Sequence, residues 1–248
     1  MANSILGMDV GGSSIKAGLV DVETGHPLTP LASVATPQPA TPARVMDAIV
    51  AIDRSFASSG PVGLALPSVV QQGIARTAAN IDKSWLGANP AELLAARIGR
   101  PVACLNDADA AGLAEMRWGA GRGSHGVAIM LTFGTGIGSA LFTDGRLLPN
   151  TELGHLEVDG RDVETWASAR VRTAEGLDWP AWAARVNVYL ARMHALFWPD
   201  LFILGGAVSE NFKAFAPLLV SPAEIRAAAF TGQAGIIGAA LAASALGT

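Results

Sequence analysis

Short apolar runs, rich in β-branched residues, alternate along the chain with segments in which apolar residues recur at helical spacing. Runs of this kind, bounded by Gly, Pro and Asp, are typical of strands. We expect strands at 5–10, 15–20, 62–66, 102–105, 127–133, 139–143 and 201–204. The helical pattern predicts helices starting at 42 and spanning 90–98, 108–118, 165–174, 180–197 and 235–245. Strands that alternate with helices predict an α/β fold.

Two helices in the first half of the chain have recognisable ends. Thr41 precedes Pro42 and Asn89 precedes Pro90, and a polar cap followed by proline is a common helix start. Gly99 is expected to end the second of these helices. The first helix is expected to bury one apolar face, formed by Val45, Ile49, Ile52 and Phe56.

Two segments far apart in the chain share one order of features. Residues 8–25 and 131–145 each contain an apolar strand, a turn of Gly with Ser or Thr, a second apolar strand and an acidic Gly turn. The likeness lies in order and spacing more than in identical residues. It predicts two related halves, each of which presents a Gly-rich hairpin.

The first Gly-rich turn, Gly11-Gly12, has two interpretations. It is either a tight hairpin turn alone or a cradle for phosphate, because successive amides and the hydroxyls of Ser13 and Ser14 can bind anionic oxygens. Asp9, at the end of the preceding strand, is a candidate to hold Mg²⁺ through water. Lys16 lies on the second strand and is a further candidate at the phosphate site.

The second hairpin offers similar groups. Its candidate phosphate ligands are Thr132, Gly134, Thr135, Gly136 and Gly138. It is not a P-loop, since the chain lacks the Gly-x4-Gly-Lys-Ser/Thr pattern, and it leads into a strand where a dinucleotide-binding turn would open a helix. A third element, Gly205-Gly206, either lines the phosphoryl-donor side or is only a strand-to-helix turn.

Polar residues follow one of the apolar strands. Asn106 and Asp107 stand between this strand and a helix, where side chains of open α/β sheets face ligands, although Asp107 is also interpretable as a helix cap. Glu152, His155 and Glu164 follow the second hairpin. Such a set suits recognition of neighbouring hydroxyls on a sugar, and phosphoryl transfer needs one group that accepts the hydroxyl proton. Asp107 is the candidate for that role.

Composition removes several classes of function. The formal net charge is −4 and no run of Lys or Arg occurs, so nucleic acid is not an expected partner. A single cysteine, Cys104, excludes a disulfide framework within the chain and a Cys-rich metal site. The apolar runs are far shorter than the ~20 residues of a membrane-spanning helix, and residues 1–4 lack a basic signal region. We therefore expect a cytoplasmic protein with no membrane partner.

Taken together, these motifs resemble the ROK (repressor, ORF, kinase) family of sugar kinases, and the resemblance covers nearly the whole chain. Residues 9–16 (DVGGSSIK) and 131–138 (LTFGTGIG) are similar to its two phosphate motifs, and 152–155 (ELGH) is similar to its sugar-binding loop. Gly205-Gly206 and 235–239 (GIIGA) look like the segments around its donor site.

The resemblance implies a fold and a site. The fold is the two-lobed, actin-like (ribonuclease-H-like) ATPase fold with a central cleft, and the assembly is a homodimer. We expect a first lobe of residues 1–110 plus 233–248 and a second lobe of 111–232. Asp107 matches the catalytic Asp, and the sugar-binding set that the resemblance implies is Asn80, Asn106, Asp107, Glu152, His155 and Glu164.

The chain departs from typical members at one loop. They follow the ELGH-like segment with a zinc-binding run CxCGxxGCxE, whereas residues 156–163 (LEVDGRDV) contain no cysteine, so no zinc is expected and His155 is left to the sugar. Loss of that loop, with 36–42 (TPQPATP) and 80–86 (NIDKSWL), resembles the polyphosphate glucokinase branch. This branch phosphorylates glucose, and in some members mannose, from inorganic polyphosphate and sometimes ATP, with Mg²⁺.

Several alternatives are weighed against that interpretation. The main one is an ATP-dependent glucokinase without the zinc loop, because polyphosphate and ATP present the same terminal phosphoanhydride. A ROK repressor would need a helix–turn–helix module ahead of Asp9. A purely structural filament protein would not explain the polar residues Asn106 and Glu152. A sugar sensor without catalysis would not explain Asp107. Polyphosphate also needs a cationic track. Its candidates, which are equally interpretable as ordinary surface charge, are Arg100, Arg117, Arg122, Arg146, Arg161, Arg170 and Arg172.

Overall fold

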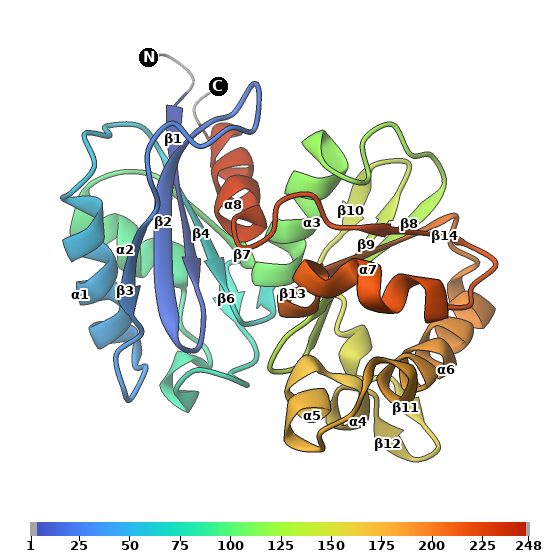
Figure 1. The fold of residues 1–248 in the computed structure, drawn as a ribbon. Coiled ribbons are helices and arrows are strands. Elements are labelled where there is room, and N and C mark those ends of the chain that lie inside the picture. The colour runs from blue at the N-terminus through green and yellow to red at the C-terminus, as the bar shows by residue number, and fades with distance from the viewer. Residues whose placement is uncertain (1–3, 247–248) are drawn as a thin grey trace. The chain divides into compact units, whose positions relative to one another are not determined.

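The computed structural model describes residues 4–246, which form two compact units (Figure 1). The first unit comprises Met1–Ala114 together with Gln233–Thr248, and the second comprises Glu115–Gly232. The chain passes from the first unit to the second inside the helix α3 (Asp107–Trp118), a few residues beyond the boundary at 110 that the sequence suggested. It returns to the first unit just before its last helix.

The first unit is built on a five-stranded sheet in the order β3-β2-β1-β4-β7. Its strands are β1 (Ser4–Val10), β2 (Ser14–Asp21), β3 (Ala32–Ala35), β4 (Val62–Leu66) and β7 (Val102–Asn106). β1 and β2 form an antiparallel hairpin, whereas β4 is parallel to both β1 and β7. The carboxyl ends of the parallel strands β1, β4 and β7 therefore lie on the same side of the sheet.

Both faces of this sheet are covered by helices. α1 (Pro42–Asp53) contacts β2 and β3, and α2 (Pro90–Ile98) contacts β7, whereas α8 (Ala234–Ser244) contacts β1, β4 and β7. Figure 1 shows α1 and α2 on the side of the sheet opposite α8. The core between the sheet and α1 and α2 includes Trp85, whose indole N–H donates to the carbonyl of Ala40 at 2.8 Å.

The backbone of α8 lies unusually close to the sheet. A Cβ added at Gly7 would stand 2.0 Å from the carbonyl oxygen of Ile236, and one added at Gly63 would stand 1.9 Å from that of Ala239. In α8 itself, a Cβ at Gly238 would lie 1.7 Å from the carbonyl oxygen of Ala110 in α3. Glycine is required at these contacts because no side chain fits between the two backbones.

The second unit repeats the topology of the first, with a sheet in the order β10-β9-β8-β13-β14. Its strands are β8 (Val127–Phe133), β9 (Ile137–Thr143), β10 (Arg146–Leu148), β13 (Leu201–Gly206) and β14 (Glu224–Ala227). β8 is antiparallel to β9 and parallel to β13, and β13 is parallel to β14. The two related halves that the sequence predicted are confirmed by this shared strand order.

Helix α6 (Trp179–Phe197) contributes Trp182, Val186, Tyr189, Leu190 and Met193 to the core of the second unit. Trp182 is fully buried, with its ring edge-on to Phe133 and Phe215 at 5.3 and 5.0 Å between centroids. The shorter elements are α4 (Glu164–Ala167), α5 (Ala169–Ala174), α7 (Phe212–Phe215) and the small hairpin of β11 (Glu157–Val158) and β12 (Arg161–Asp162). Within residues 4–246, no helix is long and apolar enough to cross a bilayer.

The structure corrects two details of the helices predicted from the sequence. The helix expected at 165–174 is two short helices, because Ser168 takes an extended ψ of 162° between α4 and α5. Its hydroxyl oxygen then accepts the N–H of Val171 at 3.4 Å and caps α5. Thr41 precedes α1 as expected but makes no capping hydrogen bond with its side chain, whereas the Oδ1 of Asn89 accepts the N–H of Glu92 at 3.2 Å.

Candidate active site

The first Gly-rich turn joins β1 to β2 as a tight hairpin. The N–H of Gly11 donates to the carbonyl of Ser14 at 2.9 Å, and the hydroxyl of Thr36 donates to the carbonyl of Gly11 at 2.6 Å. Gly12 and Ser13 are exposed at its tip. A Cβ at Gly12 would lie 3.5 Å from the carbonyl oxygen of Asn80, so the predicted sugar residue Asn80 is beside this hairpin.

Asp9 stands near the end of β1, where it pairs across the hairpin with Lys16. Its carboxylate lies against Gly235 at the start of α8, 2.8 Å from where a Cβ on that glycine would be. Burial raises the pKa of Asp9 to about 6, and the charge of Lys16 opposes the rise only in part. The negative charge of Asp9 is therefore only partly balanced by Lys16. A buried carboxylate of this kind fits the chemistry of a Mg²⁺ site, since Mg²⁺ prefers oxygen ligands and retains several water ligands.

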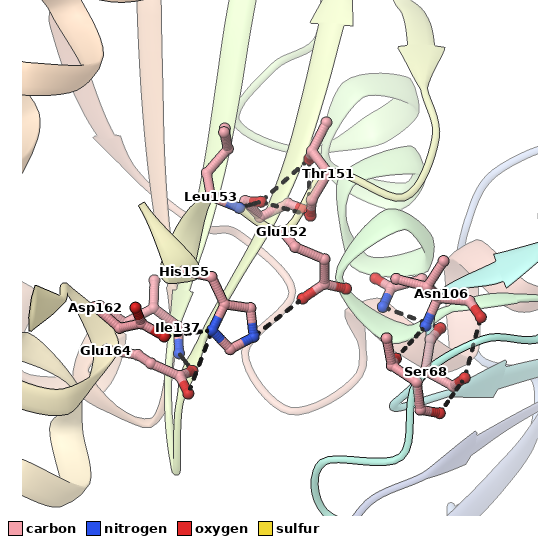
Figure 2. Close-up of polar contacts among 12 residues, drawn as sticks. Ser68, Asn106, Ile137, Thr151, Glu152, Leu153, His155, Asp162 and Glu164 are labelled. Atoms are coloured by element: carbon pink, nitrogen blue, oxygen red, sulfur yellow. Dashed lines mark hydrogen bonds and ion pairs between the residues drawn. The ribbon is translucent and has the colours of Figure 1, made fainter. Parts of the chain in front are cut away.

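Asn106 and Asp107 stand where β7 ends and α3 begins. The Oδ1 of Asn106 accepts the N–H groups of Ala108 and Asp109 at 2.8 and 3.0 Å, and its Nδ2 donates to the carbonyl of Ser68 at 3.3 Å (Figure 2). Asn106 is thus buried and caps α3. Asp107 is half-buried, and its Oδ1 accepts the N–H of Ala108 at 2.8 Å. Since Asn106 already caps the helix, Asp107 is not needed for that purpose.

The second Gly-rich hairpin joins β8 to β9 and is bound to α4 and α5. The N–H of Gly134 donates to the carbonyl of Gly136 at 3.0 Å, and the N–H of Arg170 donates to the carbonyl of Gly134 at 3.0 Å. The Oε2 of Glu164 accepts the N–H of Ile137 at 3.2 Å (Figure 2). A Cβ at Gly136 would lie 2.3 Å from that same oxygen, so the glycine gives Glu164 its place beside the hairpin.

The end of β13 lies beside the end of β8, from which this hairpin starts. Gly205 pairs with Thr132 and Gly206 pairs with Phe133. Gly206 has a φ of 82°, and a Cβ there would lie 2.4 Å from the carbonyl oxygen of Phe133. The Gly205-Gly206 element that the sequence suggested for the donor side is therefore adjacent to the second hairpin.

The loop of residues 152–155 is anchored on β9 through Ser139. The fully buried hydroxyl of Ser139 donates to the carbonyl of Thr151 at 2.7 Å and accepts the N–H of Leu153 at 3.0 Å. A Cβ at Gly154 would lie 2.1 Å from the carbonyl oxygen of Ile137, so the loop packs directly on the strand. This anchoring fixes the two polar side chains on either side, Glu152 and His155.

His155 lies among three carboxylates of the same unit (Figure 2). Its Nδ1 is 3.0 Å from Oδ2 of Asp162 and 4.0 Å from Oε1 of Glu164, and its Nε2 is 3.9 Å from Oε2 of Glu152. The hydrogen bond with Asp162 raises the pKa of His155, helped by the negative charges of Glu164 and Glu152. Burial and the nearby Glu164 raise the pKa of Glu152, against the effect of His155.

Sequence reasoning missed Asp162. The signal for it was Asp159-Gly160, a dipeptide typical of two-residue hairpin turns, which here joins β11 to β12. In residues 4–246 the structure brings no three His, Cys, Asp or Glu side chains into an arrangement able to hold a metal ion.

The arginines that the sequence offered for a polyphosphate track separate into two groups. Arg100 is already used, since its guanidinium pairs with Asp53 and donates to the carbonyl of Ser58 at 2.8 Å. Arg172 lies over the ring of Trp179, with its guanidinium carbon 3.5 Å from the ring centroid. The exposed members are Arg117, Arg122, Arg146, Arg161 and Arg170.

The fold, the polar pair Asn106 and Asp107, and the loop with Glu152 and His155 are features of one family of proteins. The model of the ROK family matches residues 5–175, and the chain belongs to that family. The polyphosphate glucokinase of Mycobacterium tuberculosis is 47% identical over 237 residues, which are 95% of this chain and 89% of the relative. The expected resemblance to the polyphosphate glucokinase branch is confirmed.

Solved structures agree with this assignment. The inorganic polyphosphate/ATP-glucomannokinase of Arthrobacter sp. strain KM is 44% identical, with a TM-score of 0.94 over 98% of this chain and 99% of the other. A ROK family glucokinase from Streptomyces griseus, solved with glucose and AMPPNP, is 27% identical, with a TM-score of 0.82 over 96% and 98%. The expected α/β fold of ROK sugar kinases is confirmed.

Proposed function

We propose that this chain transfers the terminal phosphoryl group of inorganic polyphosphate to the 6-hydroxyl of glucose, and also of mannose. The observation that carries the proposal is the 47% identity, over 95% of the chain, to a polyphosphate glucokinase. The order of Asn106 and Asp107 at the end of β7 supports it, because an amide held by backbone bonds and a half-buried carboxylate suit a sugar hydroxyl and its proton.

In the transfer, Asp107 accepts the proton of the attacking hydroxyl while the oxygen forms its bond to phosphorus and the donor departs as the shortened phosphate chain. Asn80, Asn106, Glu152, His155 and Glu164 hold the sugar hydroxyls, so that the reacting oxygen is oriented before the reaction. Asp9 would hold Mg²⁺ through water, and the ion would supply positive charge to neutralise the phosphates. Phosphate oxygens are bound by N–H groups of both Gly-rich hairpins other than those of Gly11 and Gly134, which donate within the hairpins. The hydroxyls of Ser13, Ser14, Thr132 and Thr135 add further ligands, with Lys16 beside the first hairpin.

ATP is the alternative donor. The Arthrobacter relative is named for both polyphosphate and ATP, and the Streptomyces griseus relative was solved with an ATP analogue. A chain that used only ATP would be an ordinary glucokinase without the zinc loop. The difference lies in the donor beyond its terminal phosphate, where polyphosphate needs cations and ATP needs a place for adenine.

Glucose 6-phosphate formation with Mg²⁺ tests the proposal, with polyphosphate and ATP compared at equal terminal-phosphoryl concentration. We expect polyphosphate to support more turnover than ATP, and chelation of Mg²⁺ to abolish both. Turnover with ATP alone would establish the alternative. No product from either donor, with glucose or mannose, would contradict the proposed function.

We also propose a cytoplasmic homodimer. Support for the dimer comes from large apolar side chains that are exposed on α6 and the segment next to it, namely Val188, Leu196, Trp198, Leu218 and Val220. Val188 and Leu196 are on one face of α6, and Asn187 bonds to the backbone of Leu218 and Val220 at 2.9 and 2.8 Å. A patch of this kind favours a protein contact.

The substitution Val188→Glu is expected to convert the dimer to a monomer, because a charge would be buried at the contact. Sedimentation velocity at matched concentration measures the change. Leu148→Glu, at an exposed leucine on β10, is the control and should leave the assembly unchanged. A monomeric unmodified chain, or a dimer in both variants, would contradict this placement of the contact.

A further inference from the structure

The small hairpin β11–β12 places a carboxylate against the histidine of the sugar-binding loop. The Oδ2 of Asp162 is 3.0 Å from Nδ1 of His155, within hydrogen-bond distance (Figure 2). We propose that Asp162 is a positioning residue that holds the His155 ring through Nδ1 and turns Nε2 toward the sugar. The inference rests on the proposed function, in which His155 binds a sugar hydroxyl.

The backbone of the hairpin keeps Asp162 in this place. Asp162 pairs with Glu157 across the hairpin, and the two-residue turn has positive φ at Asp159 (52°) and Gly160 (73°). Beyond the pairing, the N–H of Val163 donates to the carbonyl of Leu156 at 3.1 Å. Leu156 and Val158 pack on the core of the unit, and Val163 is part of it. The hairpin is therefore anchored to the unit at its base and along one side.

The hydrogen bond decides what each ring nitrogen can do. An ionised Asp162 can only accept a hydrogen bond, so neutral His155 carries its proton on Nδ1, donates it in this hydrogen bond and offers Nε2 as an acceptor. When His155 is protonated, Nε2 becomes a donor. In either state the ring is held in one orientation, which is the usual effect of a carboxylate behind a functional histidine.

Three acidic side chains face His155 in this unit: Asp162, Glu164 and Glu152. The hydrogen bond with Asp162 is the largest cause of the raised pKa of His155. Loss of the negative charge of Asp162 should therefore lower this pKa, and the charged form of His155 should be lost at a lower pH. Asp162→Asn removes the charge and keeps the size of the side chain.

The test follows the four histidines of the chain by NMR through a pH titration, with His155→Gln used to assign the signal. We expect Asp162→Asn to lower the pKa of His155 and to raise the KM for glucose about tenfold, with a much smaller change in kcat. Asp159→Asn is the matched control. It removes one negative charge from the same hairpin, and asparagine tolerates the positive φ of that position, so it should leave both quantities unchanged.

A second measurement needs no variant. The ¹⁵N shifts of the His155 ring in the unmodified protein, above its pKa, should show the proton on Nδ1. A proton on Nε2, or equal effects of Asp162→Asn and Asp159→Asn, would overturn the proposal.

Failure of the proposed function can be distinguished from failure of the proposal for Asp162. If the proposed function is wrong, the unmodified protein will phosphorylate no hexose from either donor, whatever the protonation state of His155. In that case the ring titration and glucose binding by calorimetry would still decide the role of Asp162.

Discussion

Replacement of Asp107 by alanine will lower kcat by about 10²–10⁴-fold, the usual range for loss of a general base, while glucose still binds. The reason is that, in the proposed transfer, the attacking hydroxyl loses the group that accepts its proton. The cap of α3 does not depend on Asp107 alone, since Asn106 also accepts the N–H of Ala108 and accepts that of Asp109. Initial rates of glucose 6-phosphate formation, with glucose affinity by calorimetry, measure the two effects separately.

Two further variants make this prediction sharp. Asp107→Asn keeps an oxygen that can accept the N–H of Ala108 but removes the base, so it should be as slow as the alanine variant. Asp178→Ala is the control, because Asp178 caps α6 through the N–H of Ala181 at 2.8 Å. This variant should lose about 1 kcal/mol of stability and should keep the turnover of the unmodified protein. Turnover retained in Asp107→Ala would remove this residue from the mechanism.

Replacement of Gly63 by alanine will destabilise the protein by more than about 3 kcal/mol, because the new Cβ would stand 1.9 Å from the carbonyl oxygen of Ala239. The contact is between backbone atoms, so no side-chain rotation relieves it, and α8 must move off the sheet. For a chain of this length, 3 kcal/mol corresponds to a fall in Tm of about 6–12 °C. Thermal unfolding followed by circular dichroism measures it.

Gly60→Ala is the matched control for this prediction. Gly60 is in the same stretch of chain, and a Cβ there would meet nothing within 4 Å. We expect a change in stability of at most about 0.5 kcal/mol. A Gly63→Ala protein as stable as the Gly60→Ala protein would show that the contact with α8 relaxes at little cost.

The sequence predicted the central strands and both Gly-rich hairpins well, because those features are local. An apolar run such as 127–133, followed by glycines and a second apolar run, allows little besides a buried hairpin. In the two five-stranded sheets, the strands that it missed lie at the edges. β14 (Glu224–Ala227) is short and partly exposed, with charged residues that hide the strand pattern, and β10 contains Arg146 in only three residues. β3 has no charge but is only four residues long and mostly exposed.

In the candidate site too, the sequence indicated residues in local motifs and missed contacts that form only when the chain folds. Asn106, Asp107 and the loop at Glu152 and His155 could be chosen as candidates from the sequence because each stands at a recognisable place after a strand or hairpin. Asp162 was missed, because its partner His155 is reached only when the β11–β12 hairpin folds back. Arg100 was offered for a phosphate track because nothing in its local sequence shows that Asp53, far away in the chain, pairs with it.

The discontinuous first unit has a consequence for synthesis on the ribosome. Its sheet is covered on one face by α8, which makes the close contacts with Gly7 and Gly63, and α8 is synthesised only after the whole of the second unit. The second unit, Glu115–Gly232, is continuous in the chain. We therefore expect the downstream unit to complete its core during translation, while the upstream unit waits with one face of its sheet uncovered. For this protein the usual order, in which N-terminal domains finish first, would be reversed.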